Sequence, residues 1–238
     1  MPCRTPGRME AAMLDLQEPV GLFPLASCPL LPAATIPLHV FEPRYRQLTQ
    51  HAIEHERPIA MAMFEGDAYQ TDYLGSPPLR PVVCVGHVLN HQQLPDGRYH
   101  ILLRGLCRAR IEGEEFDPPT LYRQARLSSI EDTTTLEIDL GPARDKLDRL
   151  LADPALDQLA SFKPLREHLT DELPTPVVVD LATLCTGASD DERYDVLAQP
   201  DPRERATWLT HHLAELLATL HAADRFSLPT DDDGLPLN

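Results

Sequence analysis

Two segments with strand-like periodicity, residues 82–94 and 98–111, flank the turn sequence Pro95-Asp96-Gly97. Apolar and polar side chains alternate throughout the second segment, and this period predicts a β-strand with one buried face. At the turn, the proline presets φ and the glycine accepts a positive φ. The two segments therefore predict a long β-hairpin, which excludes a helical bundle in this half of the chain.

Gly105 lies at the midpoint of the second arm, on its apolar face. Few small domains contain a straight strand of this length. A glycine inside a strand often marks a bend or a bulge. We therefore expect the hairpin to bend at Gly105, as strands do at the corner of a small β-barrel.

Proline punctuates the apolar runs at residues 20–38. Because proline cannot donate to a strand ladder, we expect edge strands and turns there. Residues 43–56 change to helical spacing, with Pro43 in the first turn. Further expected elements are a buried strand at 58–64, a polar loop at 65–80, and an alternating strand at 121–130 with Leu121, Ala125 and Leu127 on one face.

Helical spacing dominates after about residue 140. Ser189-x-x-Glu192 and Asp201-x-x-Glu204 have the form of capping boxes, and Gly187 is a plausible helix-ending glycine. We therefore expect an α+β protein. A mostly antiparallel, barrel-like sheet with one inserted helix, and with no parallel sheet, should precede an α-helical bundle.

The charge balance bears on the partners and the compartment. The chain carries 37 acidic and 21 basic residues, a net charge of −16, which disfavours binding to nucleic-acid phosphates. No apolar run approaches the ~20 residues that span a bilayer, so we expect no membrane partner. The cysteines form no C-x-x-C pair, which fits a reducing cytoplasm better than a disulfide framework or a zinc ribbon. They are Cys3, Cys28, Cys84, Cys107 and Cys185.

The segment LFPLASCPLLPAATIPLHVFEPRYRQL, followed by VGHVLNHQQLPDGRYHILLRGLCRARI, resembles the N-terminal substrate-binding domain of Lon proteases. The segments VVVDLATLC, DERYDVLA and DPRERATWL are also similar, so the resemblance spans about residues 20–222. The matching positions are Leu22–Leu25, Pro37, Leu38, His39, Phe41, Glu42, Arg44, Tyr45, Val85, Gly86, Asp96, Gly97, Arg98, Gly105 and Arg108.

The resemblance implies a PUA-like β-barrel followed by a helical bundle, and a role in gripping proteins rather than cutting them. We place the barrel at residues 19–131 and the bundle at 140–222. A flexible leader is expected at 1–18 and an acidic disordered tail at 223–238.

The ATPase and peptidase of full-length Lon are not expected here, because the sequence contains no G-x-x-x-x-G-K-[ST] loop. We expect a free-standing, bacterial-type recognition domain without enzymatic activity and without a cofactor. It would bind unfolded or extended protein segments or act as an adaptor in proteolysis. The net negative charge favours basic, apolar client segments.

Candidate peptide-binding residues are Phe41, Tyr45, Phe64, Leu89 and Tyr99. Proline-rich loops that border an apolar barrel mouth favour an extended peptide, either in a groove or along an edge strand. Phe41, Tyr45 and Phe64 fit a hydrophobic core equally naturally. Glu42 and Arg44 fit a local ion pair at the start of a helix better than a ligand contact.

One alternative is an RNA-binding PUA-like protein. Arg98, Arg104, Arg108 and Arg110 share one face of the second hairpin arm. The same face also fits a solvated surface balanced by the nearby glutamates, and the net charge opposes RNA.

Another alternative is a metal-dependent hydrolase, because His51, Glu54 and His55 match the H-x-x-E-H pattern. A solvated helix edge explains these residues as well. Cys84 and Cys107 fit small core residues better than nucleophiles.

Overall fold

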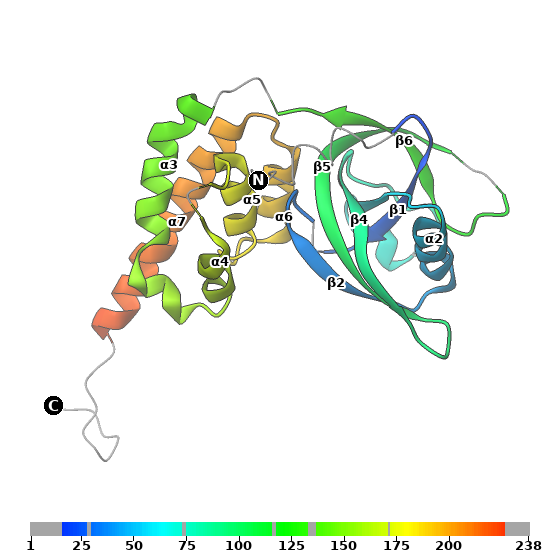
Figure 1. Cartoon of the computed structure of the whole chain (residues 1–238), viewed down its shortest axis with the longest axis horizontal. Helices are drawn as coiled ribbons and strands as arrows, with labels where there is room; N and C mark the ends of the chain where they lie inside the picture. The colour runs from blue at the N-terminus through cyan, green and yellow to red at the C-terminus, as the bar shows by residue number, and fades with distance from the viewer. Residues whose placement is uncertain are drawn as a thin grey trace, which may run out of the picture. The chain divides into compact units, whose positions relative to one another are not determined.

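The computed structural model describes residues 16–27, 30–72, 75–115, 118–132, 137–170 and 172–226. The fold is mixed α+β with a six-stranded sheet (Figure 1). The chain divides into two compact units. The first contains the described residues up to Asp132 together with Ser189–Pro200, and the second contains the other helices. Most of the expected leader (1–15) and tail (227–238), as well as Cys3 and Cys28, lie outside the described residues.

The strands of the first unit close into a ring of paired strands. The order is β2-β5-β4-β3-β1-β6, and β6 also pairs with β5. Five strands therefore form the ring, and β2 pairs with β5 outside it. The strands are β1 (Val20–Leu25), β2 (Thr35–Val40), β3 (Ile59–Met63), β4 (Val82–Gln93), β5 (Tyr99–Glu115) and β6 (Gln124–Ile130).

The pairing is mostly antiparallel, as expected, but the expectation that no strands pair in parallel was wrong. β1 and β3 run parallel, with Leu22 opposite Ala60. A parallel pair requires a crossover between its strands. Here the chain passes through β2 and the helix α2 (Pro43–Glu54) before it returns in β3.

β4 and β5 form the long hairpin expected at residues 82–111 (Figure 1). Gly97 has φ +80° at the turn, a conformation that glycine adopts without strain. The register shifts between Val85 and Gly86, opposite Cys107 and Gly105. The irregularity expected at the midpoint of the second arm is therefore present.

Gly105 allows the proline-rich segment to lie directly against β5. A Cβ added at Gly105 would lie 2.3 Å from the carbonyl oxygen of Leu31, far inside van der Waals contact. The Gly105 N–H donates to the Ala34 carbonyl, and the Gly105 carbonyl accepts from the Ala33 N–H, both at 2.9 Å. A side chain at this position would break this close approach.

Two further strand expectations were wrong in detail. β1 is not an edge strand, because it pairs with β3 and with β6. Pro24 is tolerated there because the pairing with β6 covers only Val20 and Gly21. β6 begins at Gln124, so Leu121 lies before the strand and is 61% exposed instead of sharing its buried face.

Helix α2 and strand β3 appear where the sequence predicted them, and Pro43 occupies the first turn of α2. Tyr45, Leu48 and Ala52 are the buried apolar residues of α2. The loop at 65–80 contains a short 3-10 helix, Ala68–Gln70. The ring encloses an apolar core of Val20, Leu22, Ala60, Ala62, Val83, Val85, Ala109, Ala125 and Leu127.

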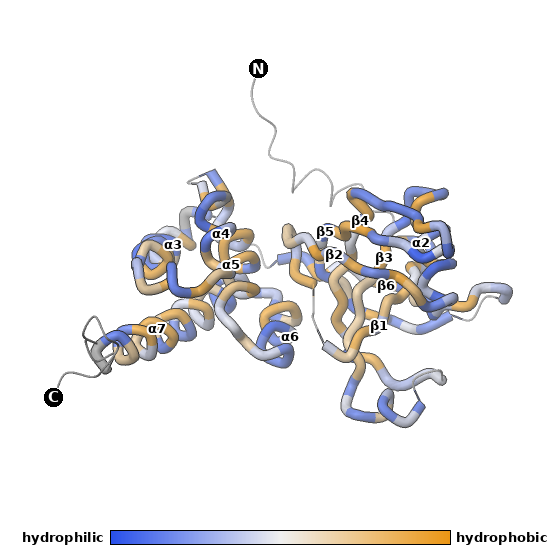
Figure 2. Tube along the Cα trace, turned by 90° about the horizontal axis from the view of Figure 1, so that it is seen from below, coloured by the Kyte–Doolittle hydropathy of each residue, from blue (hydrophilic) through white to orange (hydrophobic). Residues whose placement is uncertain are grey.

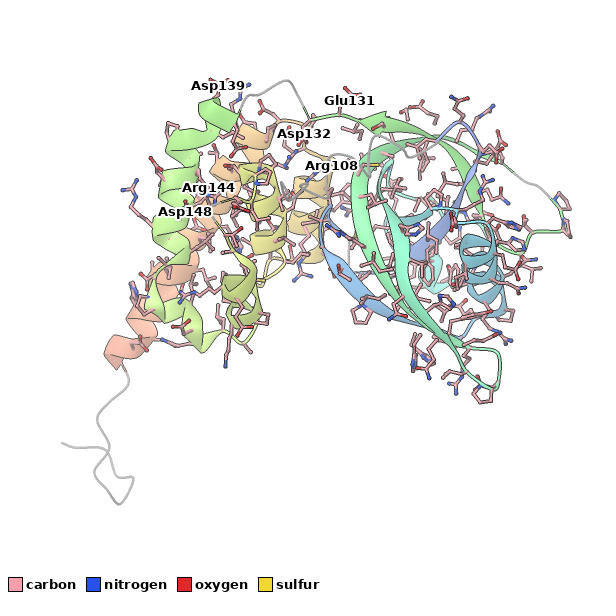
Figure 3. All side chains as sticks on the ribbon, viewed as in Figure 1. Arg108, Glu131, Asp132, Asp139, Arg144 and Asp148 are labelled. Atoms are coloured by element: carbon pink, nitrogen blue, oxygen red, sulfur yellow. The ribbon has the colours of Figure 1, made fainter. Side chains whose placement is uncertain are left out.

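The second unit consists of α3 (Glu137–Leu151), the 3-10 helix η2 (Pro154–Gln158), α4 (Phe162–His168), α5 (Thr175–Thr183) and α7 (Pro202–Phe226). Along α7, hydrophobic and hydrophilic residues are interspersed within each turn (Figure 2). Its apolar side joins a core with α3, η2, α4 and α5. Arg144 and Asp148 form an ion pair at 2.9 Å on the surface of α3 (Figure 3).

Helix α6 (Asp190–Ala198) belongs to the first unit, which differs from the continuous bundle expected for residues 140–222. Its start has the expected capping box between Ser189 and Glu192. The hydroxyl of Tyr194 accepts a hydrogen bond from the Val82 N–H at 2.9 Å. The Arg80 guanidinium lies 4.6 Å from the Tyr194 ring centroid. These contacts hold α6 on the sheet.

Candidate functional site

Apolar side chains are exposed around one part of the sheet. Of the four large apolar side chains exposed among the described residues, Leu102 lies on β5, Leu89 lies on β4, and Phe41 directly follows β2. Phe41 is 60% exposed and Leu89 is 50% exposed. The fourth, Leu121, lies in the segment before β6. Exposed apolar groups that gather on a surface often mark a protein-binding site.

The register of β2 and β5 defines the surface on which Leu102 lies. In an antiparallel pair, residues directly opposite each other project from the same face. The opposed pairs are Thr35 with Arg104, Pro37 with Leu102, and His39 with His100. All six are exposed or half-buried, and we call this set the outer face.

Ring contacts join the residues at one end of the outer face. The rings of His39 and His100 lie 4.7 Å apart, and the ring of Phe41 lies 6.1 Å from that of His39. The Nη1 of Arg98 donates to the Nε2 of His39 at 3.3 Å. On the β4 side, Asn90 pairs with Leu102, and Leu89 lies at the neighbouring bulge. Phe41 and Leu89 thus border the outer face from two sides.

One edge of β2 has no strand partner among the described residues, because β2 pairs only with β5. The Gly105 N–H donates to the Ala34 carbonyl, so the even-numbered residues of β2 face β5. Backbone groups alternate in direction along a strand. Those of Thr35, Pro37 and His39 therefore point to the open edge. Pro37 lacks an N–H, but its nitrogen points to the open edge, so the pairing of β2 with β5 loses no hydrogen bond.

Hydrogen bonds at the hairpin turn agree with this assignment. The Leu94 N–H donates to the Arg98 carbonyl at 2.8 Å. The even-numbered residues from Arg98 to Leu102 therefore bond to β4, which leaves the odd-numbered residues of β5 to bond to β2. These odd-numbered residues, Tyr99, Ile101 and Leu103, lie opposite the even-numbered residues Val40, Leu38 and Ile36 of β2. The backbone groups of those β2 residues are the ones assigned above to the edge that faces β5.

The charges on the outer face are basic. Arg104 forms no ion pair with any of the described residues. Arg98, at its border, pairs with Asp96 at 2.6 Å. The backbone N–H and then the guanidinium of Arg98 lower the pKa of the Asp96 carboxyl. The nearby Glu42 is bound to Arg44 at 3.0 Å, the local ion pair that the sequence indicated.

The candidate peptide-binding residues divide by burial. Phe41 and Leu89 are exposed, whereas Tyr45, Phe64 and Tyr99 are 3%, 4% and 7% exposed. The Tyr45 ring stacks on Phe23 at 4.1 Å, and its hydroxyl donates to the Pro24 carbonyl at 3.3 Å. These three buried rings are therefore core residues in this conformation.

Leu102 and Pro37 are surface apolar residues that were not among the predicted peptide-binding residues. The sequence did indicate the exposure of Leu102. Its even number places it on the same face of the second hairpin arm as the polar residues His100 and Arg104. An apolar residue on an otherwise polar strand face is exposed, and it is a natural candidate for contact with a partner.

The four arginines considered for RNA do not form one exposed surface. Arg108 is 4% exposed, and its Nε donates to the Leu197 carbonyl of α6 at 3.1 Å. Arg98 is bound to Asp96 at the hairpin turn. Arg110 is exposed, but it lies beyond Arg108 along β5, which separates it from Arg104.

The H-x-x-E-H residues lie beside a cavity of about 540 Å³. His51 and His55 line it, and the Nδ1 of His51 is 2.9 Å from the Tyr122 hydroxyl. Glu54 instead accepts a hydrogen bond from Gln50 at 2.8 Å. Within the described ranges, no three His, Cys, Asp or Glu side chains come together as metal ligands would.

The two core cysteines are not placed as nucleophiles. Cys84 is fully buried, and burial raises the pKa of the Cys107 thiol, which opposes formation of a thiolate. None of the helices in the described part of the chain has the length and apolar character needed to cross a membrane.

Comparison with known proteins agrees with the fold. A family model described as the ATP-dependent protease La (LON) substrate-binding domain matches residues 19–215. No curated protein matches the chain.

Among solved structures, the chain is similar to a Lon N-terminal domain protein from Xanthomonas campestris, with 25% identity and a TM-score of 0.51. That match covers 81% of this chain and 96% of the other. The N-terminal domain of a Mycobacterium avium complex Lon protease has 14% identity and a TM-score of 0.64, with 83% and 98% covered. This second similarity concerns the fold alone.

Proposed function

Because the chain belongs to the LON substrate-binding domain family, we propose that it is a non-enzymatic protein-recognition module that binds unfolded or extended segments. Binding would take place at the outer face and at Phe41 and Leu89 beside it. Such a module delivers segments to a partner, which makes it an adaptor in cytoplasmic proteolysis. The PUA-like description of the ring at residues 19–131 forms part of this proposal.

The observation that carries the proposal is the exposure of Phe41, Leu89 and Leu102 around one sheet surface beside an unpaired strand edge. A site of this kind offers apolar contact area and backbone hydrogen-bonding groups together. Both are features that extended segments of different sequence share. It therefore suits a module that recognises unfolded segments more than one specific folded partner.

The experiment is a titration of a labelled, reduced and alkylated protein that cannot fold, monitored by fluorescence anisotropy. We expect saturable binding with a Kd of about 10–300 µM, a range of weak transient contacts. Phe41→Ser and Leu102→Ser should each weaken binding by about three- to tenfold. Leu121→Ser is the matched control, because Leu121 is at least as exposed as Phe41 and Leu102 but lies outside the outer face.

Structured RNA is the competitor in the same titration. Saturable binding to RNA without binding to the unfolded protein would replace the proposal with the RNA-binding alternative. Equal losses for Leu121→Ser and Leu102→Ser would show that contact is not confined to the outer face.

A further inference from the structure

We infer that the bound segment pairs with the open edge of β2 as an added strand, and that it carries acidic side chains among apolar ones. This inference rests on the proposed function and adds both the mode of binding and the class of segment. It predicts recognition through the backbone of the segment and through the charges of the outer face.

The backbone groups on the open edge are the first part of the argument. Thr35 and His39 each present an N–H and a carbonyl there, and Pro37 presents a carbonyl. The side chains of these three residues are exposed, so the surface around these groups is open to solvent. Unpaired strand edges are templates for pairing with another chain.

Pro37 limits what can pair at this edge. Proline on an edge strand protects against uncontrolled association, because it interrupts the row of donors. β2 has only six residues, and the missing donor lies between those of Thr35 and His39. A short segment can still accept hydrogen bonds from the N–H groups of Thr35 and His39, whereas a longer one would extend past the end of the strand. The edge therefore suits a short extended segment.

Local charge is the second part of the argument. The net charge of −16 favours basic clients when it is averaged over the chain. Charges farther than ~10 Å away are largely screened at 0.1 M salt, so the nearest groups decide. The outer face contains Arg104 and two histidines but no carboxylate. The neighbouring Asp96 is bound to Arg98.

A segment that pairs with β2 places alternate side chains beside Thr35, Pro37 and His39, on the same side of the sheet as Arg104 and Leu102. Acidic side chains there meet Arg104, and apolar ones meet Pro37 and Leu102. Basic side chains would meet Arg104 with the same sign of charge. The outer face therefore favours acidic, apolar segments over basic, apolar ones.

Matched peptides test the charge preference. Three labelled peptides share an alternating framework of Leu, Val and Thr and differ only in carrying Glu, Gln or Lys at the same positions. We expect the Glu peptide to bind about five- to tenfold more tightly than the Lys peptide at low salt, with the difference shrinking at 0.5 M NaCl. Arg104→Gln should reduce the same difference, whereas Arg126→Gln, on β6, should not.

N-methylated peptides test the added strand without changing the protein. Methyl groups on alternate backbone nitrogens block only one of the two hydrogen-bonding sides of a strand. We expect one alternating set to lose about tenfold or more in affinity and the other set to bind nearly as the parent peptide does. Two protein variants add to this measurement, because His39→Pro removes an outward N–H that His39→Ala keeps.

The outcomes separate the inference from the proposed function. Equal affinities of both N-methylated sets, together with equal effects of His39→Pro and His39→Ala, would overturn the added strand while leaving binding at the outer face intact. Tighter binding of the Lys peptide would overturn the acidic preference. Failure of every peptide and of the unfolded protein to bind would refute the proposed function itself.

Discussion

The Nε of Arg108 on β5 donates a hydrogen bond to the carbonyl oxygen of Leu197, which lies near the end of α6 and 89 residues later in the chain. The last carbonyls of a helix have no partner within the helix. Arg108 satisfies one of them from a position that is 4% exposed (Figure 3). An arginine that alternation alone would place in solvent thus joins a helix to the sheet.

Arg108→Met should destabilise the first unit by about 1–3 kcal/mol, because it leaves the Leu197 carbonyl buried without this donor. The change is measured by urea unfolding followed by circular dichroism. Arg110→Met is the matched control, since Arg110 is exposed on the same strand and should change the free energy of unfolding by less than about 0.5 kcal/mol. Equal effects of the two variants would contradict the role of Arg108.

Gly105→Val should cost about 1–3 kcal/mol or more, because its Cβ would lie 2.3 Å from the Leu31 carbonyl oxygen and 2.9 Å from the Sγ of Cys84. Thermal melting measures the loss. Gly113→Val on the same strand is the control, since a Cβ there meets no atom within 4 Å. An unchanged melting temperature for Gly105→Val would mean that the proline-rich segment does not lie against β5.

Tyr194→Phe should cost about 1–3 kcal/mol at neutral pH, because the buried Val82 N–H loses the hydroxyl that accepts its hydrogen bond. Tyr69→Phe is a suitable control for the loss of a hydroxyl, since Tyr69 stacks on Phe64 through its ring. Urea midpoints of the two variants decide the matter, and similar shifts would argue against the Tyr194 contact.

The same tyrosine predicts a pH dependence. Burial is the main cause that raises the pKa of Tyr194 above its ordinary value of about 10. Above that pH the unfolded chain loses the phenol proton while the folded chain keeps it. The free energy of unfolding should therefore fall as the pH rises above about 10. Wild type should lose more stability than Tyr194→Phe over this range, and parallel curves would refute the assignment.

Asp180→Asn should destabilise the second unit by about 3–5 kcal/mol, because Asp180 is 2% exposed and lies 3.8 Å from the buried Arg205. The double variant Asp180→Leu/Arg205→Met should lose less stability than the sum of the losses of Asp180→Leu alone and Arg205→Met alone. The reason is that it leaves no buried charge without its partner. A double-mutant cycle measures the coupling. Asp157→Asn, in an exposed pair with Arg166, should cost under about 1 kcal/mol.

Local patterns of the sequence predicted most of the strands and helices. The hairpin, α2 and the Ser189 capping box depend on periodicity, proline geometry and capping groups, which act over a few residues. The parallel pairing of β1 with β3 depends on contacts distant in sequence. No periodicity in either strand specifies its partner.

Burial limited what could be predicted of the candidate site. Proline-rich loops beside an apolar barrel mouth suggested a groove lined by aromatic residues, but Tyr45, Phe64 and Tyr99 are buried in the interior. Phe41 and Leu89 are exposed, and alternation would have added Leu102 to them. The burial of Arg108 required knowledge that α6 lies against the sheet and accepts a hydrogen bond from Arg108, which only the three-dimensional arrangement provides.

The return of α6 to the first unit also has a consequence during translation. All six strands are synthesised before the residues between Asp132 and Ser189, and α6 is synthesised only after those residues. At about 5–20 residues per second, the sheet waits several seconds for Leu197. During that interval the nascent chain has Arg108 and the Val82 N–H without their α6 partners. The first unit is therefore completed only after the residues between Asp132 and Ser189, nearly all of which belong to the second unit, have been made.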